Sequence, residues 1–327
     1  MANEEHTHAH LFVKAQTLLR AADRVLLVMH QNPDGDTLGS ATALSLYLDD
    51  LRKPHDLFCA NASPSNYAFL PNSNRIQTNP SLLVDGSHDV LVSLDSGDLV
   101  YAGIHNHLQE RTKARHTIIN IDHHKTNTHY GDLNIIDAHS SSTAEIVYNY
   151  FIHTEHPITT DSATCMLTGI ISDTGGFSNL ATTSSALNVA SELLRFGARI
   201  WDIQQHTLKN KSIHALKLWG VVLSRLKRHT SGVVITVLTQ NDIISCNASV
   251  EHAEGIANFL NTLDDSRAVF LLSELEPGKI KISMRSTQPG VDVSHFARVF
   301  GGGGHKKAAG LSIPGSIMVS GNSFHIA

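Results

Sequence analysis

The sequence is poor in cysteine and has no long apolar run, and each absence excludes a class of protein. Its three cysteines lie far apart, at positions 59, 165 and 246, so we expect neither a disulfide framework nor a zinc knuckle. No apolar run approaches the length that crosses a membrane, and residues 1–8 are too polar and acidic for a signal peptide. These features predict a cytoplasmic protein that does not contact a membrane.

Basic charge is also scarce. A net charge of −5 argues against a protein that coats long nucleic acid, because such proteins usually have a basic surface. A local basic pocket for short, mostly single-stranded RNA or for a mononucleotide is compatible with this charge. We therefore predict short ligands and no stable complex with long nucleic acid. Whether the chain forms a homodimer is left open by the sequence.

Apolar segments of strand type alternate with segments of helical type between about residue 20 and residue 180. The predicted strands cover 24–30, 56–60, 88–95, 117–122 and 133–137. The predicted helices cover 10–22, a segment ending at 48, a segment from 98 to 108, 142–151 and 160–171. This alternation predicts an α/β fold with a doubly wound, mostly parallel sheet.

The length of the chain leaves room for a second domain. We predict an N-terminal domain over residues 1–182, a helical linker over 183–230 and a smaller α/β domain over 231–327. Within the linker, one helix ends at Gly197 and a long, charged helical stretch runs from Trp201 to Arg228. The alternatives of a packed helix and a free tether both remain open for this stretch. In the last part, two strands over 268–273 and 279–284 flank the dipeptide Pro277-Gly278, which predicts a hairpin.

The stretch from Thr117 to Asn127 combines a buried strand with a chemically active end. Its β-branched run stops in Asp122-His123-His124, at a strand end of the kind where open α/β sheets bind ligands. Imidazole and carboxylate together suit a first-row divalent metal, and Lys125 would suit a neighbouring phosphate. The alternative is a hydrogen-bonded turn with solvated histidines.

Three further segments end in the same way. After the first strand, Pro33 and Gly35 force a tight turn that lets His30, Asp34 and Asp36 converge; the alternative is that Asp36 only caps the next helix. The third strand ends at Asp95, and Asp98 is interpreted as the cap of the helix through 108. Ser142 to Glu145 matches a capping box, so Glu145 is interpreted as structural. The fifth helix ends near Asp173, before a glycine pair.

Six ligand-type side chains from four separated segments are what a two-metal site requires. One carboxylate bridges the ions, and each ion keeps an open position for water and substrate. The candidate ligands are His30, Asp34, Asp36, Asp95, His123 and Asp173.

A glycine run, Gly301 to Gly304, is the second candidate site. A backbone without β-carbons can approach an anion closely, and successive amides can bind phosphate. Lys306 and Lys307 add charge, and a helix over 306–311 would present its N-terminus. The alternative is a mobile hinge. Arg285, which could bind a terminal phosphate through its guanidinium, favours the binding site.

On these motifs the sequence resembles the DHH phosphoesterases. The N-terminal matches are His30-x-x-x-Asp34-x-Asp36, Asp95, Asp122-His123-His124 and Asp173-Thr-Gly. The C-terminal matches, 281–286 and 301–310, resemble the DHH-associated C-terminal domain. Together they cover nearly the whole chain. Length and motifs are most similar to the nanoRNase and pAp phosphatase type, the bifunctional oligoribonucleases.

The resemblance implies two Mn²⁺ ions. It assigns one ion to His30, Asp34 and Asp95, and the other to Asp36, Asp95, His123 and Asp173, with Asp95 bridging. It also implies that His124 faces the scissile phosphate and that Asp122 orients the neighbouring histidines. Substrate binding is assigned to Arg285, Gly302, Gly303, Gly304 and His305.

The implied reaction is hydrolysis of short oligoribonucleotides, of linear dinucleotides or of the 3′-phosphate of pAp, by water that two metal ions activate. The substrate would lie between a metal-binding lobe and a lobe that holds one end of it. Two alternatives remain open. A family II inorganic pyrophosphatase would have the same metal lobe, but a partner domain rich in lysine and arginine. A non-catalytic nucleotide sensor would have lost ligands, and here every ligand position is filled.

Overall fold

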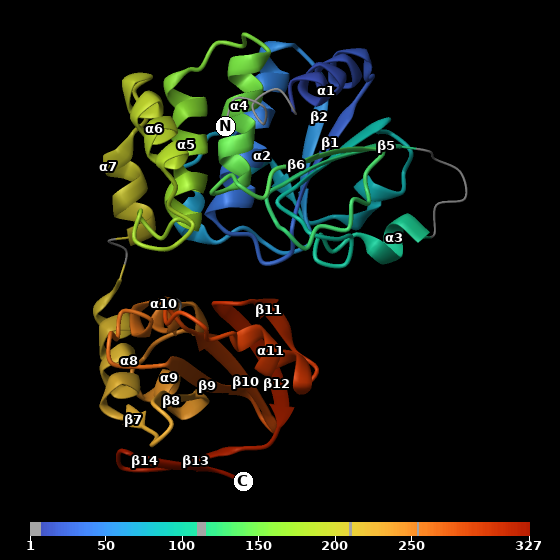
Figure 1. The fold of residues 1–327 in the computed structure, drawn as a ribbon. Coiled ribbons are helices and arrows are strands. Elements are labelled where there is room, and N and C mark those ends of the chain that lie inside the picture. The colour runs from blue at the N-terminus through green and yellow to red at the C-terminus, as the bar shows by residue number, and fades with distance from the viewer. Residues whose placement is uncertain (1–7, 110–115, 209–210, 254) are drawn as a thin grey trace. The chain divides into compact units, whose positions relative to one another are not determined.

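The computed structural model describes residues 8–109, 116–208, 211–253 and 255–327 (Figure 1). The chain divides into two compact units, residues 1–210 and residues 211–327. Each unit has its own hydrophobic core. In the described residues, no helix is both long and apolar enough to span a bilayer.

The first unit is built on a sheet of six parallel strands in the order β3-β2-β1-β4-β5-β6. The strands are β1 Val25–Met29, β2 His55–Cys59, β3 Ile76–Gln77, β4 Val90–Leu94, β5 Thr117–Asp122 and β6 Leu133–Ile136. Every residue of β1 and β4 is buried, because helices or loops cover both faces of the sheet. The predicted α/β fold with a parallel sheet is confirmed.

Helices of the first unit mostly cover one face of its sheet. They are α1 Ala9–Ala21, α2 Gly35–Asp50, α3 His105–Gln109, α4 Thr143–His153, α5 Thr160–Asp173, α6 Ser184–Arg195 and α7 Ile200–Ile203. Helix α5 packs on both α2 and α4, which also contact each other, and it contacts α6 as well (Figure 1). The other face is covered by α3 and by loops with short helical turns. Of the short turns, η3 Pro80–Leu83 lies on this face. The others are η1 Ser65–Tyr67, whose Tyr67 belongs to the core on the helical face, η2 Ser73–Arg75 and the π-helical turn η4 Gln204–Leu208.

Two predicted helices of the N-terminal half and the linker are wrong. The segment after Asp98 is a turn closed by a glycine, Gly103, with φ +73°, and helix α3 begins only at His105. The long helical stretch expected from Trp201 to Arg228 is not continuous. Helix α7 and the turn η4 reach Leu208, residues 209–210 lie outside the described residues, α8 Ile213–Ser224 begins afresh, and residues 227–228 are a strand. The hydroxyl of Ser212 caps α8 by accepting the amide of Ala215. Helix α7 packs on α5, whereas α8 packs on the second unit's sheet.

The second unit is built on a mixed sheet of six strands in the order β11-β12-β10-β9-β8-β7. The strands are β7 Lys227–Arg228, β8 Val233–Thr239, β9 Ala268–Glu276, β10 Lys279–Arg285, β11 Gly303–His305 and β12 Ala308–Pro314. Strands β8 and β9 are parallel and the other pairs are antiparallel. The hairpin predicted at Pro277-Gly278 joins β9 to β10, so that prediction is confirmed.

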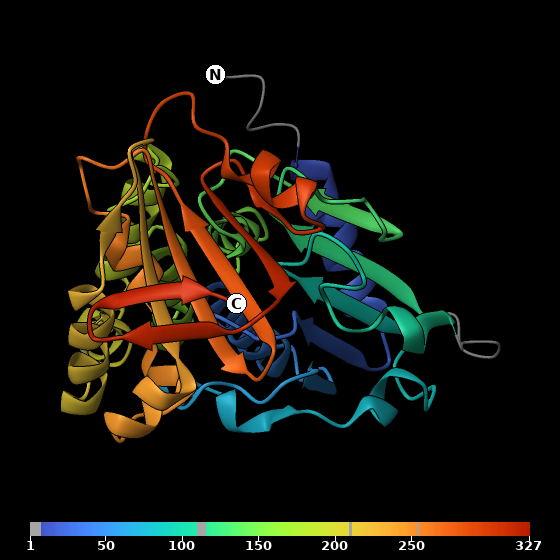
Figure 2. The same cartoon turned by 90° about the horizontal axis from the view of Figure 1, so that it is seen from below.

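Both faces of this sheet are covered. One face carries α8, with α9 Gln240–Ser245, the turn η5 Val250–Ala253 and α10 Ile256–Leu260. The other face carries α11 Val293–Val299 and a separate hairpin, β13 Ile317–Ser320 with β14 Ser323–Ile326. Figure 2 shows this hairpin crossing the face of the sheet.

The helix predicted over residues 306–311 is wrong, because those residues form the turn and the first part of β12 in a hairpin with β11. Two glycines explain the tight pairing. A β-carbon at Gly302 would collide with the carbonyl oxygen of Gly310, and one at Gly304 would lie 2.5 Å from the carbonyl oxygen of Ala308. The glycine run therefore has a structural reason of its own.

Candidate metal centre

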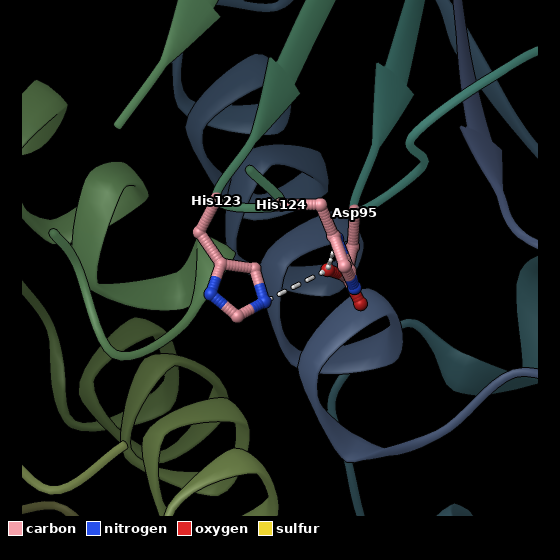
Figure 3. A group of neighbouring side chains, drawn as sticks. All are labelled: Asp95, His123 and His124. Atoms are coloured by element: carbon pink, nitrogen blue, oxygen red, sulfur yellow. Dashed lines mark ion pairs between the residues drawn. The ribbon is translucent and has the colours of Figure 1, made fainter. Parts of the chain in front are cut away.

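The carboxyl ends of β4 and β5 bring an aspartate and two histidines together. Asp95 follows β4, and His123 and His124 follow β5, its parallel neighbour; Figure 3 shows the three side chains. Oδ1 of Asp95 lies 3.6 Å from Nε2 of His123 and 3.6 Å from Nδ1 of His124. Asp95 has φ +58°, a left-handed conformation that turns the chain sharply at the strand end.

The end of β1 contributes a second histidine–aspartate group. Nε2 of His30 lies 3.4 Å from Oδ2 of Asp95 and 3.7 Å from Oδ1 of Asp34. The other ring nitrogen of His30, Nδ1, lies 2.8 Å from the carbonyl oxygen of Gln31. A proton on Nδ1 therefore makes a hydrogen bond to this backbone carbonyl. That bond fixes the ring with Nε2 directed at the carboxylates, an arrangement typical of metal-binding histidines.

Asp34, not Asp36, caps helix α2. Its Oδ1 accepts the amides of Asp36 at 2.9 Å and Thr37 at 3.2 Å. The alternative in which Asp36 is only a helix cap is therefore wrong. The carboxylate of Asp36 is fully buried and accepts the amides of Thr143 at 2.6 Å and Ala144 at 2.9 Å, at the N-terminus of α4. The partial positive charge of that helix end stabilises the carboxylate.

Helix α5 places Asp173 opposite His123, with Oδ2 of Asp173 at 3.1 Å from Nε2 of His123. Glycines at the contact between α2 and α5 make this approach possible. A β-carbon at Gly39 would collide with the carbonyl oxygen of Cys165, and one at Gly169 would lie 2.6 Å from Oδ1 of Asp36. Larger residues would hold the two helices apart, and with them Asp36 and Asp173.

The six side chains predicted to converge therefore lie together. Three sets of potential ligand atoms fall within 4.8 Å of one another in the described residues: His30, Asp34 and Asp95; Asp36, His123 and Asp173; Asp95, His123 and His124. Asp95 belongs to two of these sets. The set of Asp36, His123 and Asp173 does not include Asp95, but Oδ1 of Asp95 lies 3.6 Å from Nε2 of His123, which belongs to that set. The three sets therefore adjoin one another through Asp95 and His123, and the role of each residue as a ligand stays a prediction.

The electrostatics of the cluster require added positive charge. Burial alone would lower the pKa of His30, but Asp34 and Asp95 outweigh it and raise that pKa to about 12. His123 likewise has its pKa raised to about 11, since Asp173 and Asp95 outweigh burial. Burial, with the charges of Asp95 and Asp173, raises the pKa of Asp36 well above its usual value. Protons on the two imidazoles partly neutralise the carboxylates.

Divalent metal ions fit this donor set. First-row ions accept mixed imidazole and carboxylate ligands. Nε2 of His123 is buried without a hydrogen-bond partner, although it lies 3.1 Å from a carboxylate oxygen of Asp173. A metal ion between these two atoms would coordinate both of them. Its charge would replace the positive charge of the imidazole protons.

The remaining residues of the Asp122-His123-His124 motif form a hydrogen-bonded support. Asp122 is fully buried; its Oδ1 accepts Nδ1 of His124 at 2.7 Å and the amide of His123 at 2.9 Å. Its Oδ2 accepts Nδ2 of Asn127 at 2.5 Å. Burial would raise the pKa of Asp122, but these bonds, led by that of His124, lower it. Asp122 therefore orients the His124 ring through the hydrogen bond at Nδ1, and its carboxylate belongs to none of the three ligand sets.

Sequence reasoning missed two contributors to the site. Asn127 bonds Asp122 and also donates to the carbonyl oxygen of Ser96, which links the ends of β4 and β5. Thr143 donates its hydroxyl to Oδ1 of Asp95 at 3.1 Å, besides its amide to Asp36. The signal for Thr143 was present, since Ser142 was predicted to begin a helix, but nothing local showed what that helix end faces. Glu145 was interpreted from the sequence as structural. Its carboxylate accepts hydrogen bonds from the amide of Ser141 and the hydroxyl of Ser185.

In the second unit, Arg285 and His305 lie in one row across the sheet. Arg285 on β10 and His305 on β11 both pair with Ala308 on β12. Directly opposed residues point to the same face, so the two side chains share a face at roughly 10 Å, two strand spacings. Nε of Arg285 donates to Oδ1 of Asn258 at 3.0 Å, which fixes its guanidinium. Lys307 bonds carbonyl oxygens of Gln288 and Val291, so its charge serves the fold.

Comparison with known proteins places the chain in a family. Residues 24–170 match the DHH family N-terminal domain, and residues 229–320 match the DHHA1 domain. The chain is 30% identical over 302 residues to the bifunctional oligoribonuclease and PAP phosphatase NrnA of Thermus thermophilus, covering 92% of this chain and 87% of that protein. This chain belongs to the DHH phosphoesterase family.

Other members support the assignment. The NrnA protein of Bacillus subtilis is 24% identical over 294 residues, covering 89% of this chain and 90% of that protein. The crystal structure of an exopolyphosphatase-related protein from Bacteroides fragilis superposes with a TM-score of 0.86 at 26% identity, covering 94% of this chain and 92% of the other. As a DHH phosphoesterase the chain is a hydrolase that depends on divalent metal.

Proposed function

We propose that this protein is a manganese-dependent phosphoesterase that hydrolyses short oligoribonucleotides, including linear dinucleotides, the 3′-phosphate of pAp, or both. The observation that carries the proposal is the group of three adjoining ligand sets, which meet at Asp95 and His123. It is joined by similarity to named oligoribonucleases over most of both chains. Three buried, unpaired cysteines fit a reducing cytoplasm as its location.

The residues present divide between two ions. His30, Asp34 and Asp95 would hold one ion, and Asp36, Asp95, His123 and Asp173 would hold the other. When bound, the two ions supply positive charge to the phosphoryl oxygens and lower the pKa of coordinated water. The histidines favour manganese over magnesium, which prefers oxygen ligands.

His124 is the candidate for direct contact with the scissile phosphate. Its side chain is 23% exposed, whereas that of Asp122, which holds its Nδ1, is fully buried. Burial would lower the pKa of His124, but the hydrogen bond to Asp122 and the charge of Asp95 raise it. A raised pKa favours the protonated imidazole, which can donate to a phosphoryl oxygen as negative charge develops there.

The second unit would bind the end of the substrate that does not react. Arg285 and His305 share one face of its sheet, and the exposed backbone of Gly303 and Gly304 lies in the same hairpin as His305. Gly302, packed against β12, keeps this hairpin closed. A fixed guanidinium and an exposed glycine backbone in one sheet suit a terminal phosphate.

The test compares initial rates on three substrates with the manganese-loaded protein. A 5′-phosphorylated dinucleotide and pAp should be hydrolysed, and pyrophosphate should be hydrolysed far more slowly. The Asp95→Asn variant, expected to be inactive, controls for contaminating nucleases. Faster hydrolysis of pyrophosphate would support the pyrophosphatase alternative. Tight nucleotide binding without hydrolysis of any substrate would support the sensor.

A further inference from the structure

One aromatic side chain at the metal centre has no part in the ligand sets. The ring of Tyr101 stacks on the ring of His30, with centroids 4.7 Å apart and an interplanar angle of 27°. His30 is only 2% exposed, while Tyr101 remains 43% exposed. Because one face of the tyrosine ring lies against His30, its exposed surface belongs to the opposite face and the edge. An accessible aromatic surface therefore borders the candidate metal site.

The backbone holds Tyr101 in this position. Its amide donates to Oδ1 of Asp98 at 2.7 Å, and its carbonyl oxygen accepts the amide of Gln31 at 3.1 Å. The side chain of Gln31 also donates to the carbonyl oxygen of Val100 at 3.3 Å. The turn after β4 is thus tied to the residue that follows His30. Asp98, interpreted from sequence as a helix cap, instead positions this turn.

We propose that Tyr101 forms a nucleobase subsite, in which its exposed ring face stacks on the base of the nucleotide whose phosphate lies at the metal centre. This inference rests on the proposed function and adds a residue that recognises the base. A base is joined to its 5′-phosphate through one ribose, so its ring falls within a few ångströms of the phosphate site. Stacking on an aromatic ring tolerates every base, which suits a substrate of mixed sequence.

The position of Tyr101 separates base recognition from the chemistry. Its ring stacks on the ring of His30, whereas Asp34 and Asp95 lie near the Nε2 atom of that ring. The tyrosine therefore adds an apolar, planar surface next to a strongly charged cluster. A phosphate without a base would use only the charged cluster, whereas a nucleotide would use both.

The experiment measures binding of AMP and of ribose 5-phosphate, which lacks the base, to the manganese-loaded protein by calorimetry. Wild type should bind AMP roughly ten- to a hundredfold more tightly, the range of one base–aromatic stack. Tyr101→Phe should keep the preference, and Tyr101→Leu should reduce it to near unity while ribose 5-phosphate binds as before. Tyr148→Leu, a change at a half-buried tyrosine of α4 that packs on the core, is the matched control.

Two results would overturn the inference. One is equal affinity of wild type for AMP and ribose 5-phosphate. The other is an equal loss of both ligands in Tyr101→Leu, which would mean that the tyrosine only positions His30; manganese affinity measured in the same variants would then fall as well. These outcomes are independent of the proposed reaction. A base preference carried by Tyr101 can stand even if dinucleotides are not hydrolysed, and hydrolysis can stand without it.

Discussion

Gly169 on α5 lies directly against the carboxylate of Asp36 on α2. A β-carbon at Gly169 would be 2.6 Å from Oδ1 of Asp36 and 2.5 Å from the β-carbon of Ala144. The packing of α5 on α2 and the position of Asp36 in the candidate metal centre therefore both depend on the lack of a side chain at residue 169. A glycine inside a helix thus sets the position of a candidate ligand.

Gly169→Ala should reduce both stability and metal binding. Crowding at this packed contact should cost roughly 1–3 kcal/mol of unfolding free energy, and displacement of Asp36 should lower manganese affinity. Urea unfolding and calorimetric metal titration measure the two effects. Gly220→Ala in α8 is the matched control, since a β-carbon there has open space. It should leave metal binding unchanged and stabilise its helix by up to about 1 kcal/mol. Wild-type metal affinity in Gly169→Ala would contradict the inferred role of the contact.

Asp95→Asn should be among the most damaging single changes for turnover. The carboxylate would contact both proposed ions, because it lies in one ligand set with His30 and Asp34 and 3.6 Å from Nε2 of His123. Asparagine keeps its shape and tolerates the left-handed backbone at φ +58°. We expect turnover to fall by several orders of magnitude and bound manganese to fall toward one ion or none, with an unchanged circular dichroism spectrum. Asp161→Asn, at an exposed pair with Arg199, is the control and should be close to neutral. Near-normal turnover in Asp95→Asn would exclude a bridging role.

Metal binding should release protons. Neighbouring carboxylates raise the pKa of His30 to about 12 and that of His123 to about 11, so both imidazoles are protonated at neutral pH without metal. Ligation needs neutral imidazole, so each ion must displace a proton. Metal affinity should therefore rise with pH across the neutral range and weaken as pH falls. Calorimetry in buffers of different ionisation enthalpy counts the protons, and a count near zero would argue against these two histidines as ligands.

After chelation, manganese should restore activity better than magnesium or calcium. The reason is the pair of imidazole nitrogens among the candidate ligands, which manganese accepts more readily than either of the other two ions. Activity should be measured as a function of each metal after removal of the chelator. Full activity with less than one equivalent of metal bound would rule out a two-metal site.

Arg285→Ala and His305→Ala should separate nucleotide substrates from a small ester. A 5′-phosphorylated dinucleotide uses a remote phosphate, and loss of a charge-assisted hydrogen bond should lower kcat/KM by roughly ten- to a hundredfold. Bis-p-nitrophenyl phosphate needs only the first unit and should be hydrolysed nearly as before. Arg228→Ala, at an exposed pair with Asp265 in the same unit, is the control. Equal losses on both substrates would show that Arg285 acts structurally or in catalysis.

The buried pair of Arg225 and Asp242 should make the second unit sensitive to acid. Burial alone would raise the pKa of Asp242, but two hydrogen bonds from Arg225, at 2.6 and 2.8 Å, outweigh it and lower that pKa. A lowered pKa stabilises the fold above the unfolded value of about 4, and this stabilisation is lost as pH falls through the folded value. Asp242→Asn should cost up to about 3–5 kcal/mol, because the buried arginine keeps its charge but loses its carboxylate partner.

Fluorescence of Trp219, in a background with Trp201→Phe, reports unfolding of the second unit in this test. Wild type should lose stability steeply below about pH 4, and the variant should show a flatter dependence on pH, because it lacks the titrating carboxylate. Parallel pH curves for the two proteins would show that the pair does not control the acid response.

The sequence by itself determined the alternation of strands and helices and the identity of the candidate ligands. Strand ends are marked by local chemistry, since an apolar run such as 117–121 stops at a charged residue, Asp122, whatever the rest of the chain does. Parallel strands end at one edge, so side chains at these ends were expected to converge. For Asp95 and His123 that expectation holds, because β4 and β5 are neighbours.

Only the tertiary structure decided how the remaining groups reach this edge. Asp36 is held by the N-terminus of α4, more than a hundred residues away in the chain, and Asp173 by the glycine contact between α2 and α5. The stack of Tyr101 on His30 likewise joins two turns that follow different strands. Local patterns also misled where two structures compete. Residues 306–311 were predicted as a helix, but 306–307 form a turn and 308–311 belong to β12, because glycines let β11 approach β12. Such contacts depend on which surfaces meet, and no local stretch of sequence contains that information.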